Sequence, residues 1–172
     1  FVGMDMSLFD LTGKVALVTG STKGIGKAIA KRMAEQGAKV VISSRNQELC
    51  DEVAAEINGS SCTAIGISCN INYAEQLENL VKKTEDQLGR IDILVCNAAI
   101  NPYFGSSQDI PDSAFDKVMH ANIGRVHRLC KLVIPSMAQN GGGSVIIVSS
   151  IGGLKGSDAL GAYADRKSTR LN

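Results

Sequence analysis

The chain has 172 residues, of which 44% are hydrophobic and 20% charged, and its formal net charge is +1. This length and balance are typical of one globular domain with a hydrophobic core. A net charge near zero, with 4% aromatic residues and no Trp, argues against nucleic acid as a partner. Because no apolar run approaches the roughly 18 residues that a membrane-spanning helix needs, we expect no membrane partner.

The strands and helices predicted from hydrophobic periodicity alternate along the chain. In order they are a strand at 14–20, a helix at 24–37, a strand at 38–45, a helix at 47–59, a strand at 63–70, a helix at 73–89, a strand at 90–99, a helix at 113–139 and a strand at 143–150. We expect any bend in the last helix near Pro135. Continuous apolar strands that alternate with helices predict an α/β fold. The expected class is a Rossmann-type doubly wound parallel sheet with helices on both faces, truncated after the fifth strand.

The cysteines and histidines favour neither disulfides nor a metal. There are five cysteines, and none forms a C-x-x-C pair, which indicates a reduced, cytoplasmic protein. His120 and His127 have no ligand-spaced partner, so no metal site is expected. The start of the chain, FVGMDMSLFD, lacks the basic residues and apolar run of a secretion signal, and the native start is expected at Met4 or Met6.

The first predicted strand runs into the glycine-rich stretch TGSTKGIG. Glycines at the end of a strand let the backbone approach a pyrophosphate, and the following helix N-terminus offers free N–H groups. A purely structural turn is the alternative, but the first βα turn of a doubly wound fold is where dinucleotides bind. The predicted cofactor-binding residues here are Gly20, Ser21, Thr22, Lys23, Gly24, Ile25 and Gly26.

The end of the second strand bears on which dinucleotide is bound. A carboxylate there would bind the adenosine ribose 2′-hydroxyl and repel a 2′-phosphate, but this chain has Ser43, Ser44 and Arg45. Arg45 can clamp a phosphate through its planar guanidinium, and Lys23 can add a second positive charge. NADP(H) is therefore favoured and NAD(H) stays possible. A solvated surface role for Arg45 is the alternative.

The glycine turn and three later segments together resemble the classical short-chain dehydrogenases/reductases, from about Leu8 to Ala164. TGSTKGIG is similar to the family's T-G-x-x-x-G-x-G motif. CNAAI is similar to its N-N-A-G segment, with Cys96 and Ala99 in place of the first Asn and the Gly. MHANIG places Asn122 at the family's catalytic asparagine, and GSVIIVSS ends at Ser150. NAAINPYFG further resembles the carbonyl-reductase-like branch.

The resemblance implies hydride exchange between a nicotinamide and a small-molecule carbonyl or alcohol. Asn122 would hold a water in a proton relay, and Ser150 would donate to the developing alkoxide. Tyr163, thirteen residues after Ser150, would be the general acid or base, and Lys167, four residues further on, would lower its pKa. The resemblance also implies a homo-oligomeric parent protein, a dimer or tetramer. Its further cofactor-binding positions are Asn70, where the family often has Asp, Ile71, Asn97, Ala98 and Ala99.

The last eight residues, DRKSTRLN, lack the apolar stripe of the helix that the family places after its tyrosine. Their reverse translation resembles a sequencing-adapter read. We therefore expect a dinucleotide-binding domain at 1–164, C-terminally incomplete, followed by a non-native tail at 165–172. In that tail Lys167 would match the family's lysine position by chance, and it would still act on Tyr163 electrostatically if a helix formed. On this interpretation the fifth strand is an exposed apolar edge, and the polypeptide is poorly soluble with little activity.

Two other functions stay open at this point. One is an NAD-dependent dehydrogenase of a hydroxylated metabolite, and the other is a nucleotide-binding module without catalysis. The loops at 101–107 and 151–160 suggest a partly apolar substrate mouth, but they identify no single substrate.

Overall fold

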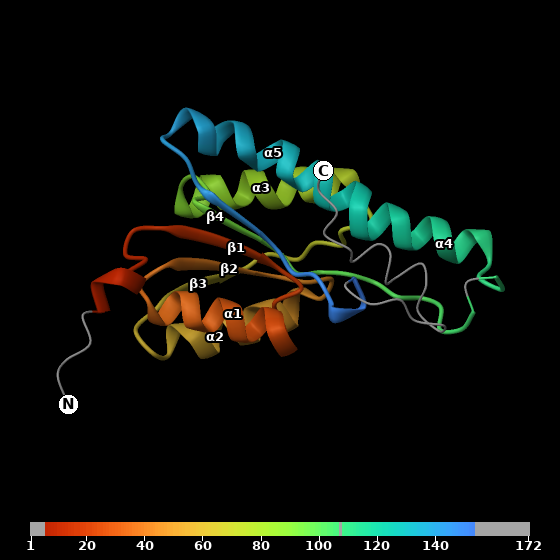
Figure 1. Ribbon diagram of the computed structural model, residues 1–172. Helices are drawn as coiled ribbons and strands as arrows, with labels where there is room; N and C mark the ends of the chain where they lie inside the picture. The colour runs from red at the N-terminus through yellow and green to blue at the C-terminus, as the bar shows by residue number, and fades with distance from the viewer. Residues whose placement is uncertain (1–5, 107, 154–172) are drawn as a thin grey trace.

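Strands and helices alternate through the computed structural model, which describes residues 6–106 and 108–153 (Figure 1). The elements are η1 (Met6–Phe9), β1 (Val15–Thr19), α1 (Gly24–Glu35), β2 (Lys39–Ser43), α2 (Gln47–Asn58), β3 (Thr63–Gly66), α3 (Ala74–Leu88), β4 (Ile93–Cys96), α4 (Asp112–Met119), the π-helical η2 (His120–Gly124), α5 (Arg125–Gln139), β5 (Ser144–Ile147) and η3 (Ile151–Gly153). Each predicted strand and helix is present, but β3, β4 and β5 are half as long as predicted or shorter, and the last helix is divided into α4, η2 and α5.

The strands form one parallel sheet in the order β3-β2-β1-β4-β5. Leu17 in the central strand β1 is in register with Val41 of β2 on one side and with Leu94 of β4 on the other. The chain therefore winds outward from β1 in one direction and then returns to build the other half. This confirms the doubly wound class and places a crevice at the carboxyl ends of β1 and β4, where such sheets bind ligands.

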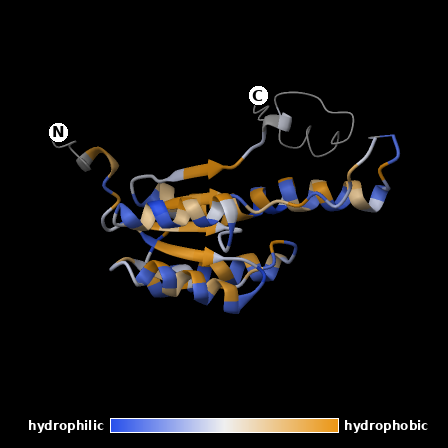
Figure 2. Ribbon diagram, turned by 90° about the horizontal axis from the view of Figure 1, so that it is seen from below, coloured by the Kyte–Doolittle hydropathy of each residue, from blue (hydrophilic) through white to orange (hydrophobic). Residues whose placement is uncertain are grey.

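Helices cover both faces of the sheet. In Figure 1, α1 and α2 lie on one face, and α3 and α5 lie on the other. Alternate residues of β1 supply the two cores, since Ala16 and Val18 belong to the cluster with α1 and α2, whereas Leu17 belongs to the cluster with α3 and α5. Figure 2 shows strands that are mostly hydrophobic, as expected for strands buried on both faces.

The outer strand β5 differs from the others. Its residues Val145, Ile146 and Ile147 are 37%, 42% and 44% exposed. The expected exposed apolar edge is therefore present at this side of the sheet.

The long helix predicted at 113–139 is interrupted by a π-helical segment. In η2 the N–H of Arg125 donates to the carbonyl of His120, five residues earlier. The α-helix α5 continues through Pro135, so the irregular turn lies upstream of the residue at which we expected it. The segment buries Ala121 and Asn122, and single π-turns of this kind often mark functional sites. Across the residues described, no helix combines the length and apolar character needed to cross a membrane.

Candidate functional site

Two of the three glycines in the turn after β1, Gly20 and Gly26, have no room for a side chain. Gly20 has φ +66°, and a Cβ on Gly26 would lie 2.3 Å from the carbonyl oxygen of Gly20. Gly24 has φ +56°, but a Cβ there would meet open space. Gly26 therefore seats the start of α1 against the turn, and Gly24 borders free volume.

Asn97 ties this turn to the segment after β4. Its side-chain Nδ2 donates to the carbonyls of Thr19 and Gly20, each at 3.0 Å. The Thr19 hydroxyl accepts from the backbone N–H groups of Asn97 and Ala98, each at 3.1 Å. These four hydrogen bonds fix the carboxyl ends of the two central strands relative to each other.

A cleft of about 810 Å³ opens at these strand ends. All but one of the predicted cofactor-binding residues line it, namely Gly20, Thr22, Lys23, Gly24, Ile25, Gly26, Ser44, Arg45, Asn70, Ile71, Asn97, Ala98 and Ala99. Seven other lining residues were not among the predicted cofactor-binding residues, namely Thr19, Ser43, Asn46, Leu49, Cys69, Asn72 and Ile100. Leu49 could have been identified from the sequence, because it is an apolar residue in the first turn of α2, four residues after Arg45.

Ser21 is the predicted residue that does not line the cleft. It is fully buried, and its hydroxyl donates to the carbonyl of Val18 at 2.7 Å and accepts from the N–H of Ser43 at 2.8 Å. Its own N–H donates to the carbonyl of Ser43 at 3.1 Å. The prediction that Ser21 belongs to the cofactor site fits these contacts poorly, because its polar groups are used inside the protein.

The charged side chains of the cleft lining are both positive. Lys23 and Arg45 are exposed, and no Asp or Glu lines the cleft within the described part of the chain. In that same part, neither cation is in an ion pair. The cleft therefore offers two uncompensated positive charges to an anion.

The turn after β3 closes another side of the cleft. The Asn70 side-chain oxygen accepts from the N–H of Asn72 at 3.1 Å, and the Asn70 N–H donates to Gln76 Oε1 at 2.8 Å. The neighbouring Ile71 packs against the core beside α3 and α5. The Asn70 amide oxygen thus stabilises this turn. The sequence comparison, which placed Asn70 where the family often has Asp, did not indicate this role.

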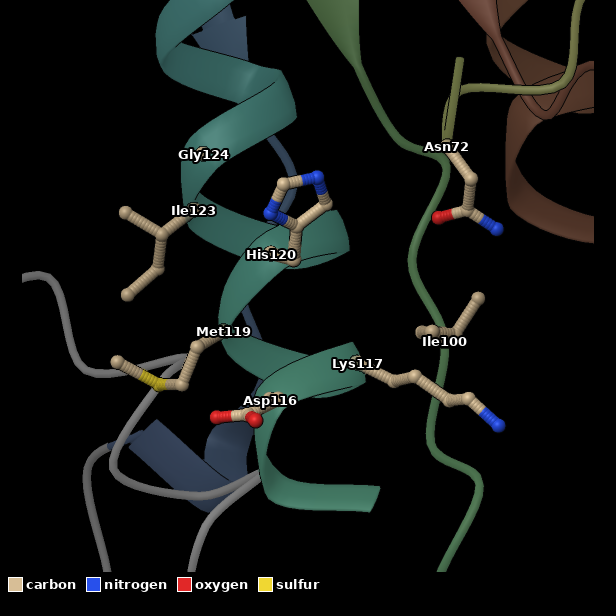
Figure 3. Close-up of a pocket in the computed structure, with 8 residues that line it drawn as sticks. All are labelled: Asn72, Ile100, Asp116, Lys117, Met119, His120, Ile123 and Gly124. Atoms are coloured by element: carbon tan, nitrogen blue, oxygen red, sulfur yellow. The ribbon is translucent and has the colours of Figure 1, made fainter. Parts of the chain in front are cut away.

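Asn122 is 1% exposed and lies in the π-helical segment η2. Its Oδ1 accepts from the N–H of Ile100 and its Nδ2 donates to the carbonyl of Ile100, both at 2.8 Å. Ile100 lines the cleft and also a second hollow of about 850 Å³. In Figure 3 the Lys117 side chain extends from the helix toward the segment that carries Ile100, and the His120 ring lies next to its own helix. Asn122 therefore fixes the wall between the two hollows.

The remaining predicted catalytic residues follow β5. Ser150 is partly buried, and its hydroxyl oxygen accepts from the N–H of Gly152 at 3.1 Å. That bond uses a lone pair of the oxygen and not the hydroxyl proton. Tyr163 and Lys167 lie outside the described residues. Among the residues that are described, no three His, Cys, Asp or Glu side chains are grouped to hold a metal.

Two thiols meet between the end of β4 and helix α5. Cys96, at the family's asparagine position, is buried and hydrogen-bonds with the partly exposed Cys130 of α5. That hydrogen bond and burial raise the pKa of Cys96 well above its ordinary value. The same hydrogen bond lowers the pKa of Cys130 to about 7. Burial alone raises the pKa of Cys69, at the edge of the cleft, to about 11.

The family model described as short chain dehydrogenase matches residues 14–169, a range that includes the cleft, Ser150, Tyr163 and Lys167. The chain belongs to the short-chain dehydrogenase family. Similar curated proteins are dehydrogenase/reductase SDR family member 4 from Bos taurus and from Homo sapiens, each 44% identical over 161 residues. The alignments cover 94% of this chain and 58% of each relative, so the chain spans less than two thirds of their length.

Solved structures of other short-chain dehydrogenases agree with this assignment. A 7 alpha-hydroxysteroid dehydrogenase complexed with NADH and 7-oxo glycochenodeoxycholic acid has a TM-score of 0.88 and 32% identity, covering 93% of this chain and 62% of that one. A short-chain type dehydrogenase/reductase from Mycobacterium marinum has the same TM-score and identity, covering 95% and 67%. The resemblance to the short-chain dehydrogenases/reductases that was inferred from the sequence motifs is therefore confirmed.

Proposed function

We propose that the protein is an NADP(H)-dependent oxidoreductase that exchanges a hydride between a nicotinamide and a carbonyl or alcohol carbon. The observation that carries this proposal is the pair of exposed cations, Lys23 and Arg45, in a cleft whose described lining holds no carboxylate. A 2′-phosphate is the group that distinguishes NADP(H) from NAD(H), and its charge suits this pair.

The backbone around the glycine turn fits a pyrophosphate. Lys23 precedes α1, and no side chain caps the first N–H groups of that helix. These N–H groups and the positive end of the helix dipole attract an anion. Gly24 borders open space, so the anion can approach the backbone directly. Gly20, Thr22, Ile25 and Gly26 complete this cradle in the proposal.

The adenosine half is assigned to the opposite side of the cleft. Leu49, four residues after Arg45, is 45% exposed and offers an apolar contact on this side. Asn70 and Ile71 are proposed to lie next to the adenine. Asn97, Ala98 and Ala99 are proposed to border the coenzyme along the segment after β4.

When bound, the nicotinamide coenzyme supplies or accepts the hydride. Ser150 is proposed to donate its hydroxyl proton to the substrate oxygen as negative charge develops there, since Gly152 occupies only a lone pair. Tyr163 is proposed to give or take the proton, and the positive charge of Lys167 to favour the tyrosinate. We assign Asn122 to holding the wall at Ile100, and its predicted relay water stays a prediction.

The protein's partners follow from the same proposal. They are a small-molecule carbonyl or alcohol and, in a dimer or tetramer, further copies of the chain. Exposed apolar residues in η2 and α5, such as Ile123 at 41% and Ile134 at 45%, support a surface on which copies of the chain could pack. A cytoplasmic location remains part of the proposal.

An NAD-dependent dehydrogenase is the second candidate, because the similar 7 alpha-hydroxysteroid dehydrogenase is complexed with NADH. The deciding experiment measures turnover of a panel of ketones and alcohols by the full-length protein, with NADP(H) and NAD(H) in parallel. We expect turnover mainly with NADP(H), lost in Tyr163→Phe. Turnover mainly with NAD(H) would favour the second candidate. Dinucleotide binding without any turnover would instead identify a non-catalytic module.

A further inference from the structure

One buried hydroxyl joins the two turns that carry the cations of the cleft. Ser21 and Ser43 are 0% and 2% exposed, and they are linked twice, from the Ser43 N–H to the Ser21 hydroxyl at 2.8 Å and from the Ser21 N–H to the Ser43 carbonyl at 3.1 Å. The Ser21 hydroxyl also donates to the carbonyl of Val18 at 2.7 Å. Lys23 follows Ser21 by two residues, and Arg45 follows Ser43 by two residues. The hydrogen bonds between Ser21 and Ser43 therefore fix the two backbone segments that lead to Lys23 and Arg45 relative to each other.

A second buried side chain, Cys50, holds the turn that carries Arg45. The Sγ of Cys50, which is 0% exposed in α2, accepts from the N–H of Ser44 at 3.2 Å and lies 3.4 Å from its hydroxyl. The carbonyl of Ser44 accepts from the N–H of Cys69 at 2.7 Å. The residue directly before Arg45 is thus held on several sides, and neither Ser21 nor Cys50 lines the cleft.

We propose that Ser21 is a positioning residue for coenzyme selectivity, which fixes the turn carrying Arg45 relative to the turn carrying Lys23, with Cys50 as a second anchor. This inference rests on the proposed function, since it concerns how that function's coenzyme is selected. It assigns selectivity to side chains that touch no ligand.

The physical reason is the difference between the two kinds of contact in the cleft. A guanidinium binds a phosphate through paired, directional hydrogen bonds, so a small shift of the turn breaks them. No ion pair within the described structure holds Lys23 or Arg45 in place, so the backbone anchors do that work. The pyrophosphate cradle depends on Gly20, Gly26 and Asn97, which are held by their own contacts. Losing the Ser21 hydroxyl would therefore weaken the binding of NADPH more than the binding of NADH.

The test compares dissociation constants for NADPH and NADH by calorimetry on the full-length protein and its Ser21→Ala variant. Removing the hydroxyl leaves the buried N–H of Ser43 without its acceptor. We expect NADPH binding to weaken about tenfold, which equals about 1.4 kcal/mol, while NADH binding changes less than about twofold. A variant that binds both dinucleotides with an unchanged ratio of dissociation constants overturns the inference.

Thr84→Val is the matched control. Thr84 is another fully buried hydroxyl, which donates to the carbonyl of Leu80 at 2.8 Å within α3, away from the cleft. Its removal should lower the melting temperature and leave the NADPH-to-NADH ratio unchanged. A change of ratio as large as that of Ser21→Ala would show that selectivity follows general stability, and this would overturn the inference.

The Cys50 variants keep the inference testable if Ser21→Ala does not fold. Cys50→Ala removes the acceptor for the Ser44 N–H and should weaken NADPH selectively, whereas Cys50→Ser should restore part of the selectivity. Equal ratios in Cys50→Ala and wild type overturn the inference in that case. If the wild-type protein itself binds neither dinucleotide, the proposed function fails. If the wild-type protein binds NADPH selectively and the variants keep that selectivity, only the present inference fails.

Discussion

The amide of Asn122 holds both backbone polar groups of Ile100, with the N–H and the carbonyl each 2.8 Å from it. Because Asn122 is buried in a π-helical turn, this contact joins the long helix to the segment that follows β4. One side chain therefore sets the wall that separates the nucleotide cleft from the second hollow.

We expect Asn122→Ala to lower the free energy of unfolding by about 1–3 kcal/mol, because it leaves two backbone groups without partners. It should also reduce kcat/KM, since the wall of the cleft moves. Thermal unfolding and steady-state kinetics of the full-length protein measure the two effects. Asn58→Ala is the matched control, because Asn58 holds the N–H and carbonyl of Ala64 in the same way at 2.6 and 2.9 Å, outside the cleft lining. If both variants reduced kcat/KM equally, the wall at Ile100 would have no special role.

Gly26→Ala should abolish dinucleotide binding. Its Cβ would lie 2.3 Å from the Gly20 carbonyl oxygen and 2.5 Å from Asn97 Nδ2, so α1 must move away from the turn. Overpacking of this kind costs about 1–3 kcal/mol of stability. Gly59→Ala is the control, since its Cβ would meet atoms only at 3.5 Å or beyond and its φ is −59°. Calorimetric binding to Gly26→Ala at wild-type affinity would contradict the close packing described here.

Arg45→Ala should raise the Michaelis constant for NADPH about tenfold or more and that for NADH little, since a hydrogen bond to a charged group contributes about 1.5–3 kcal/mol. Arg32→Ala removes an equally charged side chain that is 81% exposed and paired with Glu35 on α1, away from the cleft. That control should leave both constants unchanged. Equal effects of Arg45→Ala on the two coenzymes would remove the main support for NADP(H).

Cys130 should react as a thiolate near neutral pH. Its pKa is lowered to about 7 by the hydrogen bond from Cys96, so its ionised fraction grows as the pH rises through 7. We expect its alkylation by iodoacetamide, followed by mass spectrometry, to have a midpoint near pH 7. Cys96→Ala removes the hydrogen bond and should shift the midpoint to higher pH. An unchanged midpoint in that variant would show that Cys96 does not set the reactivity of Cys130.

The sequence predicted the sheet well because its signal is local. Apolar runs such as that around Leu17 and Leu94 mark strands buried on both faces, and glycines mark the turns between them. The alternation of strands and helices predicts a doubly wound parallel sheet, and the structure adds its order, β3-β2-β1-β4-β5.

The details that the sequence did not show depend on contacts between distant segments. The π-helical turn at His120–Gly124 has no compositional signal, and it is coupled to the bond between Asn122 and Ile100 across the fold. Ser21 looked like a ligand-binding residue because it lies within a glycine motif. Only the pairing of β1 with β2 shows that its hydroxyl points to Ser43 instead.

The central claim is that the cleft at the ends of β1, β2 and β4 binds a phosphorylated nicotinamide dinucleotide. Titration calorimetry of the full-length protein with NADPH, repeated with NADH, tests it most directly. We predict one site per chain for NADPH, with an affinity about tenfold or more above that for NADH. An absence of heat and of saturable binding with both dinucleotides, from a folded protein, would contradict the account.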